Sequence, residues 1–123
     1  MTRPLLVVDD DTDLREALEE VLRDAGYTVL GASNGREALE MLARTQPLPG
    51  LVLLDMMMPV LDGLGFAQEM HGVPDWRDIP VVIFSASASN ARVAEQVGAR
   101  AYLRKPVEVE VLLDTVGTHM QRE

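Results

Sequence analysis

Leu5-Leu6-Val7-Val8-Asp9-Asp10-Asp11 places four apolar residues directly before three carboxylates. A second apolar run, Leu51-Val52-Leu53-Leu54, likewise ends in a carboxylate, Asp55. Each run has the length of a buried strand, and its acids lie where the chain leaves that strand. If the two strands are neighbours in a parallel sheet, their carboxyl ends bring at least three acidic groups into one crevice. Carboxylates that close repel one another, and oxygen ligands favour a hard cation, so the pattern predicts a Mg²⁺ site.

The bulk composition indicates one globular domain spanning residues 1–123, large enough to form a hydrophobic core of its own. Apolar residues make up 47% of the chain and charged residues 25%, as in ordinary globular proteins. The net charge is −9 without a cluster of Lys and Arg, so we expect no direct binding to nucleic acid or to membranes. The absence of cysteine, of a signal-peptide core and of an apolar run of ~20 residues favours a cytoplasmic location.

Five apolar segments alternate with five helical patterns along the chain. The expected strands are Leu5–Val8, Thr28–Ala32, Leu51–Leu54, Val81–Ser85 and Ala101–Leu103. Three of them are apolar throughout, which is typical of strands covered on both faces. This alternation predicts an α/β fold, a doubly wound parallel sheet with helices on both faces. In such sheets ligands bind beyond the carboxyl ends of the strands.

The first helix has the clearest amphipathic pattern. Its apolar positions recur at steps of three and four residues: Leu14, Ala17, Leu18, Val21, Leu22 and Ala25. Charged residues are expected on its other side: Glu16, Glu19, Glu20 and Arg23. Asp11, Thr12 or Asp13 can cap its N-terminus, and Gly26 can end it. The other helices are expected at about Gly35–Arg44, Leu64–Met70, Asn90–Val97 and after Pro106, where Val109, Leu112, Leu113 and Val116 would be buried.

The predicted crevice also receives a hydroxyl and an ammonium group. The fourth strand ends at Ser85, and the fifth leads into Lys105-Pro106. Ionised Asp9, Asp10 and Asp55 together carry a charge of −3, which Mg²⁺ and Lys105 bring to zero. A phosphoryl group on Asp55 would replace a monoanion with roughly a dianion, whose oxygens the cations and the Ser85 hydroxyl could bind. These are the groups that phosphoryl transfer to a carboxylate requires.

A nucleotide site does not fit this crevice. A phosphate cradle needs glycine, serine and free backbone N–H groups after the first strand, and three aspartates occupy that loop. The one G-x-G of the sequence, Gly63-Leu64-Gly65, has Gln68 in place of a third glycine and follows no strand. The crevice is therefore expected to bind a cation rather than a dinucleotide.

Four motifs at the strand ends resemble a known family. They are Val7-Val8-Asp9-Asp10, Asp55-Met56-Met57-Met58-Pro59-Val60-Leu61-Asp62-Gly63, Ser85-Ala86 and Lys105-Pro106. In this order they resemble the receiver domain of response regulators (CheY-like), the phosphoacceptor module of two-component signalling, over the whole chain. The resemblance implies a flavodoxin-like sheet with the strand order 2-1-3-4-5 and five helices.

The resemblance also implies a role for each matching residue. Asp55 would accept a phosphoryl group from a histidine kinase or a phosphotransfer protein. Asp9, Asp10 and Asp55, with the backbone carbonyl of Met57, would hold Mg²⁺. Ser85 would bond the phosphoryl group and move with it, and Lys105, followed by a cis proline, would form an ion pair with it.

Three further residues would act on the phosphorylated state. Tyr102 matches an aromatic switch position, although packing explains a half-buried tyrosine equally well. Met57 and Ser87 would flank the path of the attacking water and so tune the lifetime of the phosphoryl group. The changed surface, made by the fourth helix, fifth strand and fifth helix, would bind a downstream protein. The protein would then be a regulator rather than an enzyme, apart from self-phosphorylation by small donors and self-dephosphorylation.

Two other functions stay open at this stage. One is a pseudo-receiver that binds partners without being phosphorylated, although every chemical position is filled. The other is a Mg²⁺-dependent phosphohydrolase, whose Asp-x-Asp motif and cap insertion do not follow Asp55. Ala99-Arg100-Ala101-Tyr102 lacks the acid that a symmetric dimer through the fifth strand usually uses, so that dimer is disfavoured. No effector domain follows the fifth helix, so output is expected through a partner or another part of a larger protein.

Overall fold

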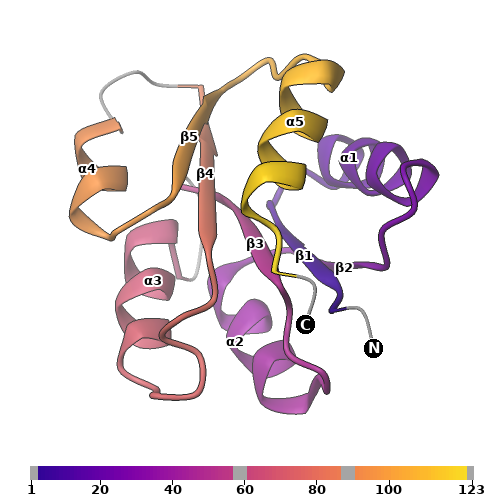
Figure 1. Cartoon of the computed structure of the whole chain (residues 1–123). Coiled ribbons are helices and arrows are strands. Elements are labelled where there is room, and N and C mark those ends of the chain that lie inside the picture. The colour runs from indigo at the N-terminus through magenta and orange to yellow at the C-terminus, as the bar shows by residue number, and fades with distance from the viewer. Residues whose placement is uncertain (1–2, 57–60, 87–90, 122–123) are drawn as a thin grey trace.

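The structure is a computed structural model that describes residues 3–56, 61–86 and 91–121. Its strands are β1 (Leu5–Val8), β2 (Val29–Ala32), β3 (Leu51–Asp55), β4 (Val81–Ser85) and β5 (Ala101–Arg104). Its helices are α1 (Thr12–Asp24), α2 (Gly35–Arg44), α3 (Gly63–His71), α4 (Ala91–Gln96) and α5 (Val109–His119). Strand and helix alternate along the chain (Figure 1), as the sequence predicts. Most of the expected boundaries coincide with those of the structure, and the others differ by one residue, Thr28 for example preceding β2.

All five strands are parallel and form one sheet in the order β2-β1-β3-β4-β5. The predicted doubly wound topology is therefore confirmed. Val8, the last residue of β1, lies opposite Leu54 of β3, and Asp55 lies opposite Phe84 of β4. The chain reverses its winding between β1 and β3, so the acids that follow these two strands lie at the centre of the carboxyl edge.

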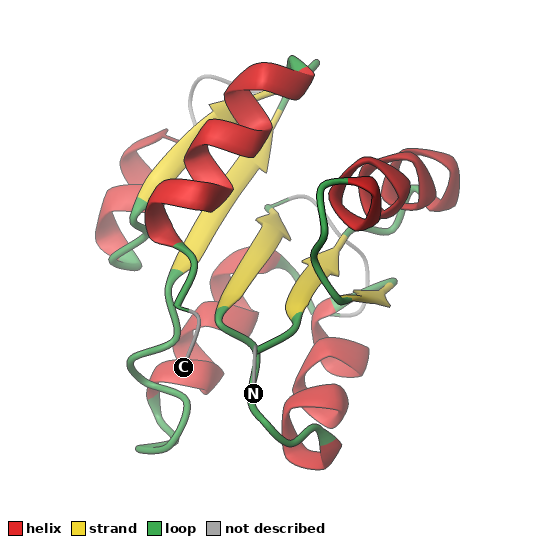
Figure 2. Cartoon of the chain, turned by 45° about the vertical axis from the view of Figure 1, so that its right-hand side comes forward, coloured by secondary structure: helices red, strands yellow, loops and turns green. Residues whose placement is uncertain are grey.

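The apolar strands separate two buried cores, one on each face of the sheet (Figure 2). Successive residues of β1 alternate between them: Leu6 and Val8 pack with α2, α3 and α4, while Leu5 and Val7 pack with α1 and α5. Each strand residue thus buries its side chain in one core or the other, because side chains of a strand point to opposite faces in turn. This explains why the central strands have no polar alternation.

Short polar side chains begin three of the helices. Asp11 caps α1 by accepting a hydrogen bond from the Leu14 N–H at 3.1 Å. Asn34 caps α2 in the same way, and Asp62 caps α3 through the N–H of Gly65. Of the three capping candidates for the first helix, Asp11 is the residue used, which places its carboxylate in a capping role.

The buried side of α1 differs from the predicted one. Ala17 and Ala25, expected inward, are exposed, and Glu19, expected in solvent, is buried. Leu18 and Leu22 pack into the core as predicted. The expectation was wrong for Glu19 because its charge is balanced by two arginines of the same helix, which a pattern of hydrophobicity does not register.

The buried face of α5 also departs from expectation. Leu112 and Val116 are buried, whereas Val109 is 50% exposed. Val109 lies in the first turn of α5, near the carboxyl edge of the sheet, where fewer strand residues lie beneath the helix. Within the described residues, each helix is too short or too polar to cross a lipid bilayer.

The first and last described segments of the chain lie together at the amino edge of the sheet (Figure 1). The Arg3 guanidinium donates to Gln121 Oε1 at 2.8 Å, and the Gln121 N–H donates to the Gly50 carbonyl at 3.0 Å. The Gly50 N–H in turn donates to the Pro4 carbonyl. Pro4 and Gln121 are therefore both hydrogen-bonded to Gly50, in the loop that precedes β3.

Candidate functional site

Three carboxylates meet at the centre of the carboxyl edge. Asp9 follows β1 directly, Asp10 is the next residue, and Asp55 ends β3. Each offers a carboxylate oxygen, and these oxygens all lie within 4.8 Å of one another. Asp9 and Asp55 are buried, while Asp10 is exposed. The cluster is therefore held by the fold on one side and open to solvent on the other.

Lys105 lies between two of these acids. Its Nζ is 3.2 Å from Asp9 Oδ2 and 3.5 Å from Asp55 Oδ1, with the side chain 21% exposed. The ammonium group also lies 4.7 Å from the centroid of the Phe84 ring. The backbone N–H of Lys105 donates to the Ser85 carbonyl, and the Lys105–Pro106 peptide is cis, as the resemblance implies. Three carboxylates and one ammonium group thus meet at the carboxyl edge of the sheet.

Ser85 and Tyr102 lie on the side of the sheet away from α1 and α5. Ser85 ends β4 and is completely buried, one residue beyond Phe84, which pairs with Asp55. Tyr102 of β5 lies opposite Ile83 and packs, half-buried, against the core that includes Ala94 of α4. Tyr102 thus packs against the core, which is one of the two roles that the sequence allows for it. Met57 and Ser87 lie outside the described residues.

The acid cluster fits a magnesium ion by its chemistry and its dimensions. All of its side-chain donors are carboxylate oxygens, the ligands that hard divalent cations prefer. Two oxygens on opposite sides of an octahedral ion lie about 4.2 Å apart, twice the usual Mg–O distance. A spread of 4.8 Å needs only a small contraction to reach that geometry.

Backbone contacts hold the acids in place. The Asp11 N–H donates to Asp9 Oδ1 at 2.9 Å, and Arg15 Nη1 donates to the Asp9 carbonyl at 2.8 Å. Beneath Asp55, a Cβ on Gly63 would lie 2.8 Å from the Asp55 carbonyl oxygen, so α3 can begin this close only with glycine. The contact of Arg15 with Asp9 was not predicted, although the spacing of four residues between Arg15 and Glu19 is the signal of an ion pair on a helix.

An apolar cavity of about 380 Å³ adjoins the cluster on the side of α1. Lys105 belongs to both, since its stem lines the cavity while its ammonium group binds the acids. The cavity is lined by Leu14, Leu18, Phe84, Ala86, Lys105, Pro106 and Val107.

Comparison with known proteins assigns the chain to one family. The model of the response regulator receiver domain matches residues 5–117. The chain is 41% identical over 120 residues to the response regulator MprA of Mycolicibacterium vanbaalenii. The aligned region covers 96% of this chain and 50% of MprA. The chain therefore spans about half the length of the curated relatives it matches.

Solved structures agree with this assignment. The chemotaxis protein CheY4 of Vibrio cholerae superposes with a TM-score of 0.88 at 29% identity, over 98% of this chain and 100% of CheY4. The response regulator TrrA of Thermotoga maritima, solved in complex with Mg²⁺-BeF, superposes with a TM-score of 0.84 at 30% identity, over 96% of this chain and 99% of TrrA. The matching family model, relatives and structures show that the chain belongs to the response regulator receiver domain family of two-component signalling.

Proposed function

We propose that this domain is a phosphorylation-dependent switch in which Asp55 accepts a phosphoryl group in a Mg²⁺-dependent reaction. The observation that carries the proposal is the position of Lys105, whose ammonium group lies within 3.5 Å of both Asp9 and Asp55. A lysine held between two buried carboxylates supplies positive charge at the oxygens where a phosphoryl group would arrive. Because three carboxylates surround one ammonium group, the charge of the cluster favours binding of a divalent cation beside Lys105.

Transfer of the phosphoryl group requires few covalent steps from the protein, which mainly positions the reactants and stabilises charge. A carboxylate oxygen of Asp55 attacks the phosphorus of a phosphohistidine, a P–O bond forms, and the P–N bond breaks. The electron pair of that bond goes to the imidazole nitrogen of the donor. Lys105 balances charge on the phosphoryl oxygens, and the Ser85 hydroxyl donates a hydrogen bond to one of them.

Magnesium would be held by Asp9, Asp10, Asp55 and the backbone carbonyl of Met57. When bound, the ion supplies charge neutralisation of the phosphoryl oxygens. The carboxylate donors and their spacing support this assignment, as does the similar TrrA, whose structure was solved with Mg²⁺-BeF. Met57 enters the set through the family resemblance alone.

The signal would pass from Ser85 to Tyr102 and then to the surface of α4, β5 and α5. Ser85 and Tyr102 lie on adjacent strands and on the same side of the sheet as α4, so a shift of the hydroxyl would be felt there. A histidine kinase or phosphotransfer protein would be the donor, and a protein that binds this surface the recipient. The domain would thus act as a regulator in the cytoplasm, without contacting nucleic acid itself, because its net charge is −9.

Incubation with acetyl phosphate and Mg²⁺, followed by intact-mass measurement, tests the proposal. The wild-type protein should gain one phosphoryl mass, and chelation of Mg²⁺ should prevent the gain. Asp55→Asn should abolish the adduct and Asp10→Asn should sharply reduce it, whereas Asp75→Asn, at an exposed carboxylate beyond α3, should leave it unchanged. Labelling of the Asp55→Asn protein at the wild-type level would disprove the assignment, and a wild-type protein without any adduct would favour the pseudo-receiver.

A further inference from the structure

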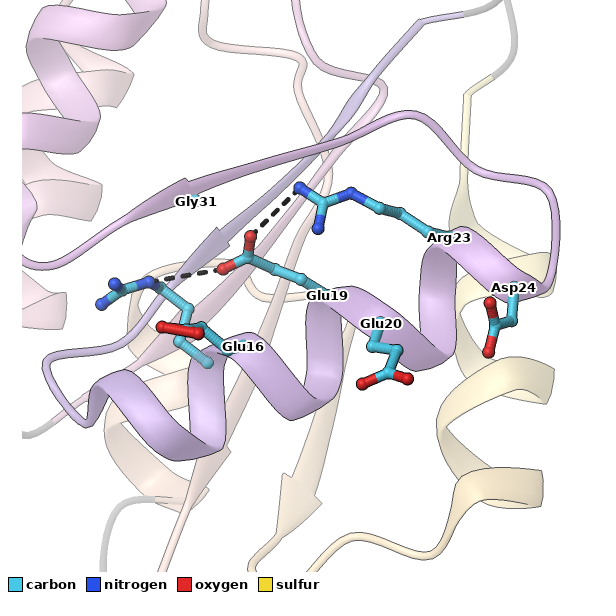
Figure 3. A pocket seen from close by; sticks show the side chains of 7 residues that line it. Glu16, Glu19, Glu20, Arg23, Asp24 and Gly31 are labelled. Carbon is cyan, nitrogen blue, oxygen red and sulfur yellow. Dashed lines mark hydrogen bonds and ion pairs between the residues drawn. The ribbon is translucent and has the colours of Figure 1, made fainter.

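Glu19 is a buried carboxylate at the centre of three charged residues on α1. Its Oε2 lies 3.4 Å from Arg15 Nε, and its Oε1 lies 3.2 Å from Arg23 Nη2 (Figure 3). The side chains of Arg15 and Glu19 are 16% and 11% exposed, whereas Arg23 is 54% exposed. The Arg15–Glu19 pair is therefore the sheltered part of the series, where an ion pair is least screened by solvent.

A glycine of β2 makes the space for this carboxylate. A Cβ built on Gly31 would lie 2.6 Å from Glu19 Oε2, closer than carbon and oxygen can approach. In Figure 3, Glu19 points toward Gly31, while Glu20 of the same helix points away from the strand. Any side chain at position 31 would therefore push the Glu19 carboxylate away from its place beside Arg15.

The outer ends of the series bind the backbone of the sheet. Arg15 Nη1 donates to the carbonyl of Asp9 at 2.8 Å, and Arg23 Nη2 donates to the carbonyl of Val29 at 3.2 Å. Glu19 thus joins a guanidinium anchored on β2 to one anchored directly beyond β1. The fork of a guanidinium allows Arg15 to hold the carbonyl and the carboxylate at the same time.

The carbonyl that Arg15 holds belongs to the peptide unit that joins Asp9 to Asp10. Holding this peptide plane restricts ψ of Asp9 and φ of Asp10, the two dihedrals that orient the side chains of these residues relative to the plane. The Asp9 N–H donates to the Ala32 carbonyl at 3.1 Å, so the residue is held from its other side by the ladder with β2. Arg15 supplies the partner for the carbonyl, at the point where β2 has ended.

We propose that Arg15 is a positioning residue for the acid cluster, kept in place by the Glu19 carboxylate in the space above Gly31. Arg15 acts through the Asp9–Asp10 peptide and does not touch the metal or the phosphoryl group. The inference rests on the proposed Mg²⁺ site, and it extends that site to residues of α1 and of the edge strand β2.

Simple electrostatics and positioning predict opposite effects of the same substitution. Removing a cation near a metal site should tighten Mg²⁺ binding, because one repulsion is lost. If Arg15 instead positions Asp9 and Asp10, its removal should weaken binding. Arg15→Gln therefore separates the two explanations by the sign of the change.

Isothermal titration of the metal-free protein with Mg²⁺ provides the measurement. We expect the Kd of Arg15→Gln to rise about fivefold, the size of one net hydrogen bond, and that of Gly31→Ala about two- to threefold. Glu19→Gln should weaken binding in the same direction. Glu20→Gln removes the same charge from an exposed position on α1, so it is the matched control and should stay within about a factor of two of the wild type.

Amide hydrogen exchange gives a second reading that needs no metal. The N–H groups of Asp10 and Asp11 should exchange faster in Arg15→Gln and Gly31→Ala, while those of β3 stay as protected as in the wild type. If Arg15→Gln fails to fold, the Mg²⁺ affinity and amide exchange of Gly31→Ala test the inference. Unchanged or tighter Mg²⁺ binding by the folded variants, with wild-type binding intact, overturns this inference only. A wild-type protein that binds no Mg²⁺ overturns the proposed function and this inference together.

Discussion

The ammonium group of Lys105 lies 3.2 Å from the carboxylate of Asp9, although 96 residues separate them in the chain. Asp9 is completely buried, so it cannot exchange this partner for water. The pair joins the loop after β5 to the loop after β1 across the width of the β3 and β4 strands. Its geometry leads to a prediction about stability in the absence of metal.

Lys105→Met should destabilise the metal-free protein by about 2 kcal/mol, because it leaves the buried Asp9 carboxylate without its countercharge. The loss should be smaller than that of a fully buried pair, since the lysine is partly exposed. Millimolar Mg²⁺ should recover part of the stability by supplying positive charge. Urea unfolding with and without Mg²⁺ measures both effects. Arg104→Met removes the same charge from an exposed neighbour, and equal loss in the two variants would contradict the prediction.

Mg²⁺ should raise the melting temperature of the wild-type protein by mass action, because it binds only where the three acids are assembled. Asp10→Asn should reduce that rise. Without metal, the same variant should be more stable than the wild type by about 0.5 kcal/mol, or about 2 °C in melting temperature, since one repelling charge is removed. Thermal melts in chelator and in Mg²⁺ give the comparison, with Asp75→Asn as control. If Mg²⁺ leaves the melting temperature of the wild-type protein unchanged, the pseudo-receiver is favoured.

Asp11→Ala should lower stability by about 1 kcal/mol through loss of the α1 cap, while Mg²⁺ affinity changes little. The hydrogen bond from the Asp11 N–H to Asp9 survives this change, because it uses the backbone. Asp11→Ser, which can cap the helix but carries no charge, should restore most of the stability. Unfolding curves and Mg²⁺ titrations of both variants decide the matter. A large loss of Mg²⁺ affinity in Asp11→Ser would instead make Asp11 a metal ligand.

The phosphorylated state should decay at an intermediate to slow rate, and Met57 and Ser87 should set that rate. The family resemblance implies that both residues flank the path of the attacking water, where an apolar Met57 would offer no hydrogen bond to orient it and Ser87 would be too short to shield the phosphoryl group fully. Met57→Asn and Ser87→Glu should therefore change the rate constant of decay. The intact-mass assay, followed over time after removal of the donor, measures it. Decay unchanged in both variants would remove these residues from the proposal.

Trp76 should be a poor reporter of the site. It packs against the core between α3 and β4, at the amino edge of the sheet, whereas the acids lie at the carboxyl edge. Trp76 and the acid cluster are therefore separated by about the length of a five-residue strand, roughly 15 Å. Tryptophan emission should therefore change little when Mg²⁺ is titrated. A strong, saturable quench that disappears in Asp10→Asn would mean that the acid cluster communicates with the other end of the sheet.

The fold could be predicted because strands that are buried on both faces of a sheet have continuous apolar sequences. β1 is apolar at every position and β3 at every position before Asp55, so acids appear only at the carboxyl ends of these strands. The same reasoning brought Asp9, Asp10 and Asp55 together, since parallel strands share one carboxyl edge. In the structure, Val8 lies opposite Leu54, and carboxylate oxygens of the three acids lie within 4.8 Å of one another.

The sequence could not place residues whose burial depends on several elements at once. Glu19 is buried because two arginines balance it and a glycine on another strand leaves it space. Val109 is exposed because α5 begins near the end of the sheet, which no helical pattern encodes. A hydrophobic periodicity records neither the charge balance of Glu19, nor the space above Gly31, nor the end of the sheet beside α5.

The hydrogen bonds that join Pro4 and Gln121 to Gly50, in the loop before β3, determine the edge of the domain at which a fused partner would begin. Both ends leave from the amino edge, roughly 15 Å, or one strand length, from the acid cluster. A fluorescent protein, a surface anchor or a neighbouring domain fused to either end would thus start on the side opposite the crevice. A tether at either end therefore begins away from the edge at which a phosphodonor would reach Asp55.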